Sequence, residues 1–168
     1  MFGDREYLSW ADVDALIDVL LPQFSHSFDA LLMITRGGIV PGGIIAEALD
    51  IRYVLTAAVR FPDPAGVEKR LIWPTFLQFP EDALLHGRRV LIVDDVWDDG
   101  RTIMTVRGRV EQAGAIPEMA VLHYKPTHSL FPEHRPHYFA AITDKWIVYP
   151  WELRRGGHMV RPITPHTS

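Results

Sequence analysis

Apolar runs of strand length constrain the fold of this chain more than any other feature. The candidate strands are residues 28–35, 51–60, 88–93, 118–124 and 137–143. Stretches such as LLMI and VLIV contain no polar residue, which is typical of strands buried on both faces of a sheet. Helices cover both faces of such sheets. The pattern therefore predicts an α/β fold with a mostly parallel central sheet.

Helical segments alternate with these runs. Ser9 is a candidate N-cap, and apolar residues recur at helical spacing through residues 10–24. Residues 44–49 and 102–113 are the next candidates. The prolines of LIWPTFLQFP, residues 71–80, predict no regular element there. Because strands and helices alternate, we expect ligands to bind at the carboxyl ends of the strands.

Composition excludes several classes of protein. The chain has 168 residues, 48% of them hydrophobic, which suits one domain with its own core. We expect that domain to span residues 1–153 and residues 154–168 to form a flexible tail. The absence of cysteine excludes disulfides and thiolate chemistry. No apolar run approaches the roughly 20 residues of a membrane span, so we expect a cytoplasmic protein. The net charge of -4 argues against nucleic acid as a partner.

Arg36, Gly37 and Gly38 directly follow the first apolar run. Consecutive glycines let the backbone turn sharply and point its N–H groups at a ligand. The arginine adds a fixed positive charge that suits phosphate or pyrophosphate. An ordinary glycine turn beside a surface arginine explains the same residues, so this motif alone leaves both interpretations open.

Aspartates cluster after the run VLIV, at Asp94, Asp95, Asp98 and Asp99. Like charges this close repel each other, so the cluster needs a cation or a ligand that offsets the repulsion. Gly100, Arg101 and Thr102 follow at the predicted start of a helix, where backbone N–H groups bind phosphate. Asp94 and Asp95 suit ribose hydroxyls and a hard cation such as Mg²⁺. A phosphate, a diol and a metal within a few residues point to phosphoribosyl pyrophosphate (PRPP).

These motifs resemble a known superfamily. VLIVDDVWDDGRT is similar to the PRPP signature of the type I phosphoribosyltransferases, and TRGGIVPGGIIAEAL resembles their pyrophosphate loop. YKP and WIVYPWE resemble the base-binding end of bacterial xanthine-guanine phosphoribosyltransferases. The resemblance extends from Leu31 to Glu152 and implies the type I phosphoribosyltransferase fold, with a small hood built from the C-terminal and N-terminal segments. It also implies transfer of the phosphoribosyl group of PRPP to guanine, xanthine or hypoxanthine, a reaction of purine salvage that releases pyrophosphate.

The resemblance implies a role for each residue of the PRPP motifs. The implied phosphate-binding residues are Arg36, Gly37 and Gly38 for pyrophosphate, and Gly100, Arg101 and Thr102 for the 5′-phosphate. Asp94 and Asp95 would hold the ribose hydroxyls and Mg²⁺, with Asp95 as the direct metal contact. Glu152 stands where relatives keep an acid that takes a second Mg²⁺. Relatives are commonly dimers or tetramers, so the resemblance also implies a homo-oligomer.

Other residues are implied to bind and activate the base. Asp98 would lie beside the purine N7 as general base or as electrostatic support for the oxocarbenium-like transition state. Lys125 would donate to the purine O6, Trp146 would stack on the base, and Ile147 would present backbone groups to its exocyclic substituent. Because a lysine donor disfavours an amino group at that position, adenine should be rejected.

The sequence departs from the family pattern at two places. Asp99 replaces the usual Thr and puts a carboxylate at the 5′-phosphate pocket. It either points away, binds the helix N-terminus itself, or impairs PRPP binding. The mobile loop lacks the Ser-Tyr pair of its relatives, and Arg70 is the residue expected to supply the basic contact there.

Other functions stay open at this point. A PRPP-binding regulatory protein with little catalysis explains Asp99 and the unusual loop, and a transferase for another base or amine is a further alternative. A phosphatase of the Asp-x-Asp type is disfavoured because Asp94 and Asp95 are adjacent. A zinc site is also disfavoured, since the spacing of the histidines between positions 123 and 137 fits no standard metal motif.

Overall fold

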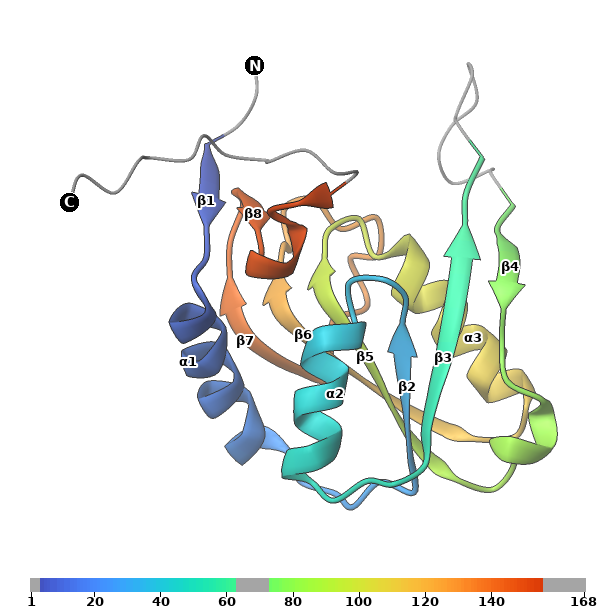
Figure 1. Ribbon diagram of the computed structural model, residues 1–168. Helices are drawn as coiled ribbons and strands as arrows, with labels where there is room; N and C mark the ends of the chain where they lie inside the picture. Colours follow the sequence, from blue (N-terminus) through green and yellow to red (C-terminus); the bar gives the residue numbers. More distant parts are fainter. Residues whose placement is uncertain (1–3, 63–72, 156–168) are drawn as a thin grey trace.

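The computed structural model describes residues 4–62 and 73–155, which form two sheets with helices around the larger one (Figure 1). The strands are β1 (Arg5–Tyr7), β2 (Ala30–Ile34), β3 (Val54–Arg60), β4 (Thr75–Gln78), β5 (Arg89–Trp97), β6 (Ile116–Tyr124), β7 (Tyr138–Ile142) and β8 (Trp146–Val148). The helices are α1 (Trp10–Leu20), α2 (Ile39–Ala48) and α3 (Arg101–Gln112), with short 3-10 turns η1 (Leu21–Gln23), η3 (Asp82–Leu84) and η4 (Pro150–Glu152).

The large sheet has the strand order β4-β3-β2-β5-β6-β7. Its neighbouring strands are parallel except β3 and β4, so the predicted mostly parallel sheet is confirmed. Side chains of the central strands alternate between two apolar cores. Leu31 and Leu91 pack on the side of α1 and α2, whereas Leu32 and Ile92 pack on the side of α3. Burial on both faces explains why these strands carry unbroken apolar runs.

The connections place the loops after β2 and β5 at a topological switch point. From β2 the chain continues to β3 on one side, and from β5 it continues to β6 on the other, although β2 and β5 are neighbours. In open α/β sheets such a point forms a ligand-binding crevice at the carboxyl ends of the strands. Figure 1 shows these ends at the top of the molecule, beside β8 and η4.

The hood combines both ends of the described chain. β1 pairs in parallel with β8, and Arg5, Glu6 and Tyr7 lie opposite Trp146, Ile147 and Val148. The predicted contribution of N-terminal and C-terminal segments to the hood is therefore confirmed. The predicted tail from residue 154 lies, apart from Arg154 and Arg155, outside the described residues.

Two predictions about the strands were wrong. The strand expected to end at residue 93 continues to Trp97, because β6 pairs with it as far as Trp97 opposite Tyr124. Asp94 and Asp95 therefore lie within β5 and not after it. The segment expected to be irregular contains the antiparallel strand β4, Thr75–Gln78. Its prolines stand outside the strand, at its two ends, and β4 is an edge strand, where proline is tolerated.

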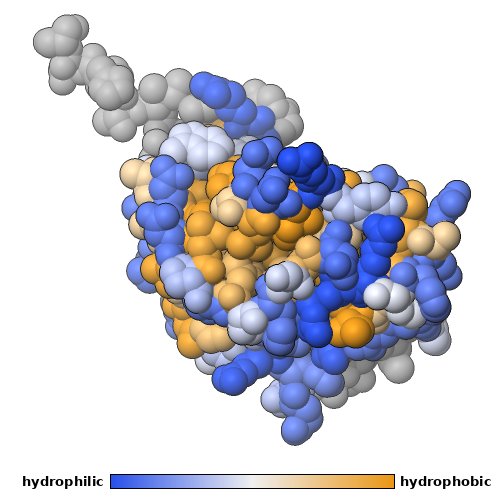
Figure 2. All heavy atoms as spheres, turned by 90° about the horizontal axis from the view of Figure 1, so that it is seen from below, coloured by the Kyte–Doolittle hydropathy of each residue, from blue (hydrophilic) through white to orange (hydrophobic). Residues whose placement is uncertain are grey.

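The face away from the hood carries apolar side chains framed by hydrophilic ones (Figure 2). At this lower end, partly buried residues such as Leu21 and Leu49 follow α1 and α2 and extend the core. Across the part of the chain that the structure describes, no helix combines the length and the apolar composition needed to span a membrane.

Candidate active site

The turn after β2 packs directly against β5 because it contains glycine. A Cβ atom on Gly37 would lie 2.5 Å from the carboxylate of Asp95. A Cβ atom on Gly38 would lie 2.2 Å from the backbone oxygen of Val93. Both distances are too short for a real contact. At Gly38 the obstacle is backbone, so this position requires glycine, whereas a side chain at Gly37 would displace the Asp95 carboxylate. The turn that contains the exposed Arg36 thus lies against the acids of β5.

Asp94 and Asp95 of β5 lie near a third acid, Glu152 of η4, which lines the same pocket as Asp95. Burial and the neighbouring charge of Asp95 raise the pKa of Asp94 well above its ordinary value. Burial and the charge of Glu152 raise the pKa of Asp95 to about 6. The predicted repulsion is therefore present in the fold, and a cation would relieve it. Among residues 4–62 and 73–155, no group of three metal-ligating side chains could hold an ion alone, so oxygen atoms of a ligand would have to complete a shell.

A pocket of about 90 Å³ lies between the large sheet and the hood. Its lining residues are Asp95, Val96, Asp98, Lys125, Trp146, Ile147, Tyr149 and Glu152. They come from the end of β5, the residue after β6, the strand β8 and the turn η4. The pocket therefore collects most residues that the sequence predicted for the base and the metal.

Lys125 is the central cation of this pocket. It is 5% exposed, and its Nζ atom lies 3.4 Å from Oδ1 of Asp98 and 5.8 Å from the centre of the Trp146 ring. The Trp146 side chain is 57% exposed, so one planar aromatic surface is accessible beside a buried cation. Such a pair can stack on a planar heterocycle and donate a hydrogen bond to its edge.

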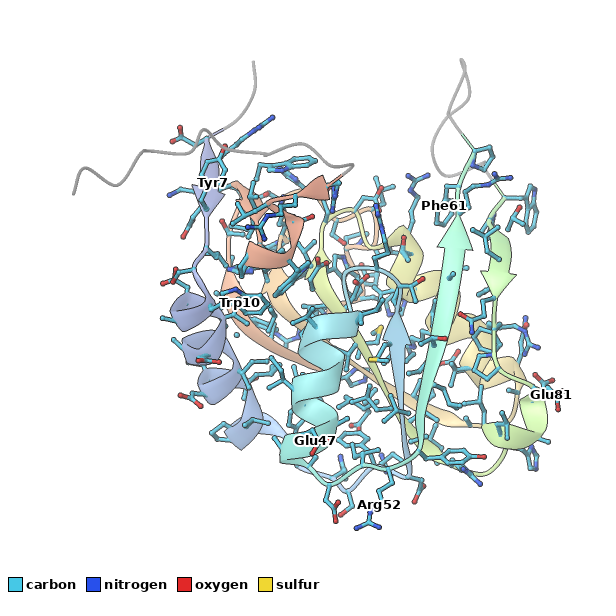
Figure 3. All side chains as sticks on the ribbon, viewed as in Figure 1. Tyr7, Trp10, Glu47, Arg52, Phe61 and Glu81 are labelled. Atoms are coloured by element: carbon cyan, nitrogen blue, oxygen red, sulfur yellow. The ribbon has the colours of Figure 1, made fainter. Side chains whose placement is uncertain are left out.

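The start of α3 holds the second predicted phosphate site. Gly100 precedes the helix with φ 84°, and a Cβ atom there would lie 2.4 Å from Nε1 of Trp97, so this turn also requires glycine. Asp99 accepts the backbone N–H of Arg101 at 3.0 Å and its Nε–H at 2.8 Å. The Arg101 guanidinium also lies 4.5 Å from the ring centre of Phe61. Figure 3 shows Phe61 at the upper end of the fold, whereas Glu47 and Arg52 lie at the lower end.

Comparison with known proteins agrees with this geometry. The family model of the phosphoribosyl transferase domain matches residues 6–155. The chain belongs to this family. A xanthine-guanine phosphoribosyltransferase of Ruegeria sp. (strain TM1040) is 32% identical over 152 residues, which cover 89% of this chain and 80% of the relative. A purine phosphoribosyltransferase from Pyrococcus horikoshii Ot3 has a solved structure that aligns with TM-score 0.76 and 28% identity, over 95% of this chain and 98% of that one.

In this phosphoribosyl transferase the predicted site residues fall into neighbouring groups. The glycine turn touches Asp95, and Asp95 lines the pocket together with the predicted base-binding residues. Gly100, Arg101 and Thr102 lie at the start of α3, as predicted, but Asp99 already holds the first N–H of that helix. Of the alternatives predicted for Asp99, the structure therefore shows that its carboxylate binds the N-terminus of α3. Arg70 lies outside the described residues.

The sequence prediction missed how Tyr149 connects the hood of the transferase to β5. Its hydroxyl donates to the backbone oxygen of Asp95 at 3.0 Å and lies 2.8 Å from Nδ1 of His123. Burial lowers the pKa of His123 to about 4, so the ring is neutral. Because the hydroxyl gives its one proton to the Asp95 carbonyl, it accepts from His123, and Nδ1 carries the ring proton. The backbone N–H of Tyr149 donates to Glu152 at 3.0 Å. No sequence signal marks this role, because an aromatic residue in such a motif equally suits a core.

Proposed function

We propose that this phosphoribosyl transferase transfers the phosphoribosyl group of PRPP to N9 of a 6-oxopurine and releases pyrophosphate, as in purine salvage. The observation that carries the proposal is the position of buried Lys125 between Asp98 and the exposed ring of Trp146. A 6-oxopurine offers a planar ring for Trp146, an oxygen acceptor for Lys125 and a ring proton for Asp98. The family membership and the purine-specific names of the relatives support the same substrate class.

The chemistry follows from these contacts. The N9 lone pair attacks C1′ of the ribose while the bond from C1′ to the pyrophosphate oxygen breaks, and the proton at N7 passes to Asp98. An anionic carboxylate at this place also stabilises the positive charge that develops on the sugar. Arg36 with the N–H group of Gly37 would bind the departing pyrophosphate. The N–H of Gly38 already donates to the Ile34 carbonyl at 2.8 Å, so Gly38 contributes the close packing of the turn and not a donor.

We further propose that the reaction depends on Mg²⁺. Asp95 and Glu152 fit this ion, because they are hard oxygen ligands and because the charge of Glu152 raises the pKa of Asp95. Asp94 would hold the ribose hydroxyls. When bound, Mg²⁺ neutralises charge on the pyrophosphate, which makes it a better leaving group.

A spectrophotometric assay with PRPP and Mg²⁺ tests the proposal when guanine, xanthine, hypoxanthine and adenine are offered separately. We expect turnover with at least one oxopurine and none with adenine. Lys125→Gln should raise the KM for the oxopurine roughly 10-fold or more, since a charge-assisted hydrogen bond is worth about 1.5–3 kcal/mol. Lys145→Gln is the matched control, because Lys145 is half exposed and pairs with Glu6 outside the pocket. Equal turnover with adenine would contradict the role of Lys125.

A PRPP-binding protein with little catalysis is the second candidate. The observation that favours it is that Asp99 accepts the backbone N–H of Arg101 and forms an ion pair with its side chain, at the predicted 5′-phosphate site. Saturable binding of PRPP in calorimetry, without turnover of any base, would favour this candidate over the transferase.

A further inference from the structure

His128 is a polar side chain of the pocket region that the proposed reaction does not use. It follows β6 in the loop that begins at Lys125, and its backbone N–H donates to the Lys125 carbonyl at 3.2 Å. Its Nδ1 atom lies 2.9 Å from Oδ1 of Asp98, a residue 30 positions earlier in the chain. An ionised carboxylate only accepts hydrogen bonds, so the proton of this bond lies on Nδ1 of His128.

The two donors around Asp98 act on the same oxygen atom. His128 contacts Oδ1 at 2.9 Å, and Lys125 contacts it at 3.4 Å. Within residues 4–62 and 73–155, the structure contains no hydrogen bond to Oδ2 of Asp98. Oδ1 therefore anchors the carboxylate, and Oδ2 is the oxygen left for a proton from the substrate.

The contact also influences the charge of Asp98. Burial alone would raise the pKa of Asp98, but the hydrogen bond from His128 and the charge of Lys125 outweigh it and lower that pKa. Apart from His128, Lys125 is the charged group that the described structure places against Asp98. If Lys125 turns toward the base, the shorter bond from His128 remains to hold the carboxylate.

We propose that His128 is a positioning residue for Asp98. Its Nδ1–H fixes Oδ1, keeps the carboxylate ionised and presents Oδ2 to the ring proton of the bound base. This inference rests on the proposed transferase function and adds to it the residue that orients its general base.

The pair His128→Ala and His128→Asn tests the inference. Alanine removes the donor, whereas the Asn side-chain amide can donate from nearly the position of Nδ1. We expect kcat at saturating PRPP and oxopurine to fall about 10-fold in the alanine variant, with the KM for PRPP unchanged. The Asn variant should keep most of the wild-type kcat. Since His128 is about half exposed, neither change should unfold the protein.

A pH profile separates positioning from a merely structural role. Loss of the donor raises the pKa of Asp98, so the acid limb of kcat should move to higher pH in the alanine variant. His134→Ala is the matched control, because His134 lies in the same β6–β7 connection but contacts Arg107. The control should keep the wild-type kcat and acid limb.

The outcomes distinguish this inference from the proposed function. An alanine variant with wild-type kcat and acid limb overturns the inference, and so does an Asn variant as slow as the alanine variant. If the wild type turns over no base, the proposed function fails first. A carbon-13 NMR titration of the Asp98 carboxyl then still tests the contact: a higher pKa in the alanine variant supports it, and an unchanged pKa overturns it.

Discussion

The carboxylate of Asp99 at the start of α3 leads to a quantitative prediction for PRPP binding. Asp99 holds the backbone N–H and the guanidinium of Arg101, which are the groups predicted to bind the 5′-phosphate. A phosphate at this place must displace the carboxylate or bind beside its negative charge. Asp99→Thr removes the charge and keeps a hydroxyl that can accept the same N–H. We therefore expect the substitution to lower the KM for PRPP.

The magnitude follows from Coulomb's law. The side chains of Asp99 and Arg101 are 28% and 19% exposed, so the effective dielectric constant lies between that of a buried site and that of water. At a separation of about 5 Å and a dielectric constant of about 40, two unit charges of like sign repel by about 1.7 kcal/mol. This corresponds to a KM roughly 10-fold lower in the variant. Because the hydroxyl can still accept the backbone N–H of Arg101, the free energy of unfolding should change by less than about 1 kcal/mol.

Initial rates against PRPP concentration at saturating oxopurine measure this effect. Asp99→Asn is the matched control for charge, since it keeps the shape and the acceptor but carries no charge, and it should show most of the gain. Raising the ionic strength should shrink the difference between wild type and variants, because salt screens partly exposed charges. An unchanged or higher KM for PRPP in both variants would refute the idea that Asp99 opposes the phosphate.

Further predictions concern stability and the acid cluster. Gly38→Ala places a Cβ atom 2.2 Å from the backbone oxygen of Val93 and should lower Tm by several degrees in scanning calorimetry, whereas Gly43→Ala, with nothing within 4 Å, should keep or raise Tm. Because folding raises the pKa of Asp95 from 3.8 to about 6, the folded state binds more protons between these values and stability falls as pH rises through them. Asp95→Asn should therefore raise Tm above that of the wild type at about pH 8 and change it little near pH 4, and it should lower turnover. A difference in Tm between variant and wild type that is the same at both pH values would contradict this. Tyr149→Phe leaves the buried carbonyl of Asp95 without its donor at 3.0 Å and should cost about 1–3 kcal/mol in urea unfolding, and a smaller loss would show that water replaces the hydroxyl.

Local sequence features predicted much of the fold and the chemical character of the site. The apolar runs predicted the parallel strands, because strands buried on both faces cannot alternate with polar residues. Gly100 and Arg101 marked the start of α3, and the aspartates before them marked a place where charge must be offset. These inferences succeed because turn geometry, helix starts and repulsion between neighbouring charges depend on residues close together in the chain.

Other features were decided only by tertiary structure. The strand β5 extends past residue 93 because β6 pairs with it as far as Trp97 opposite Tyr124, and no local pattern encodes that register. The same pairing brings the loops after β5 and β6 together, so that His128 reaches Asp98 across 30 residues of sequence. The sequence left open whether the Asp99 side chain points away or binds the helix N-terminus, and packing placed its carboxylate on Arg101. The sequence by itself determined which chemical groups the site contains, whereas packing and strand register determined which of them touch, because contacts between distant residues depend on the whole fold.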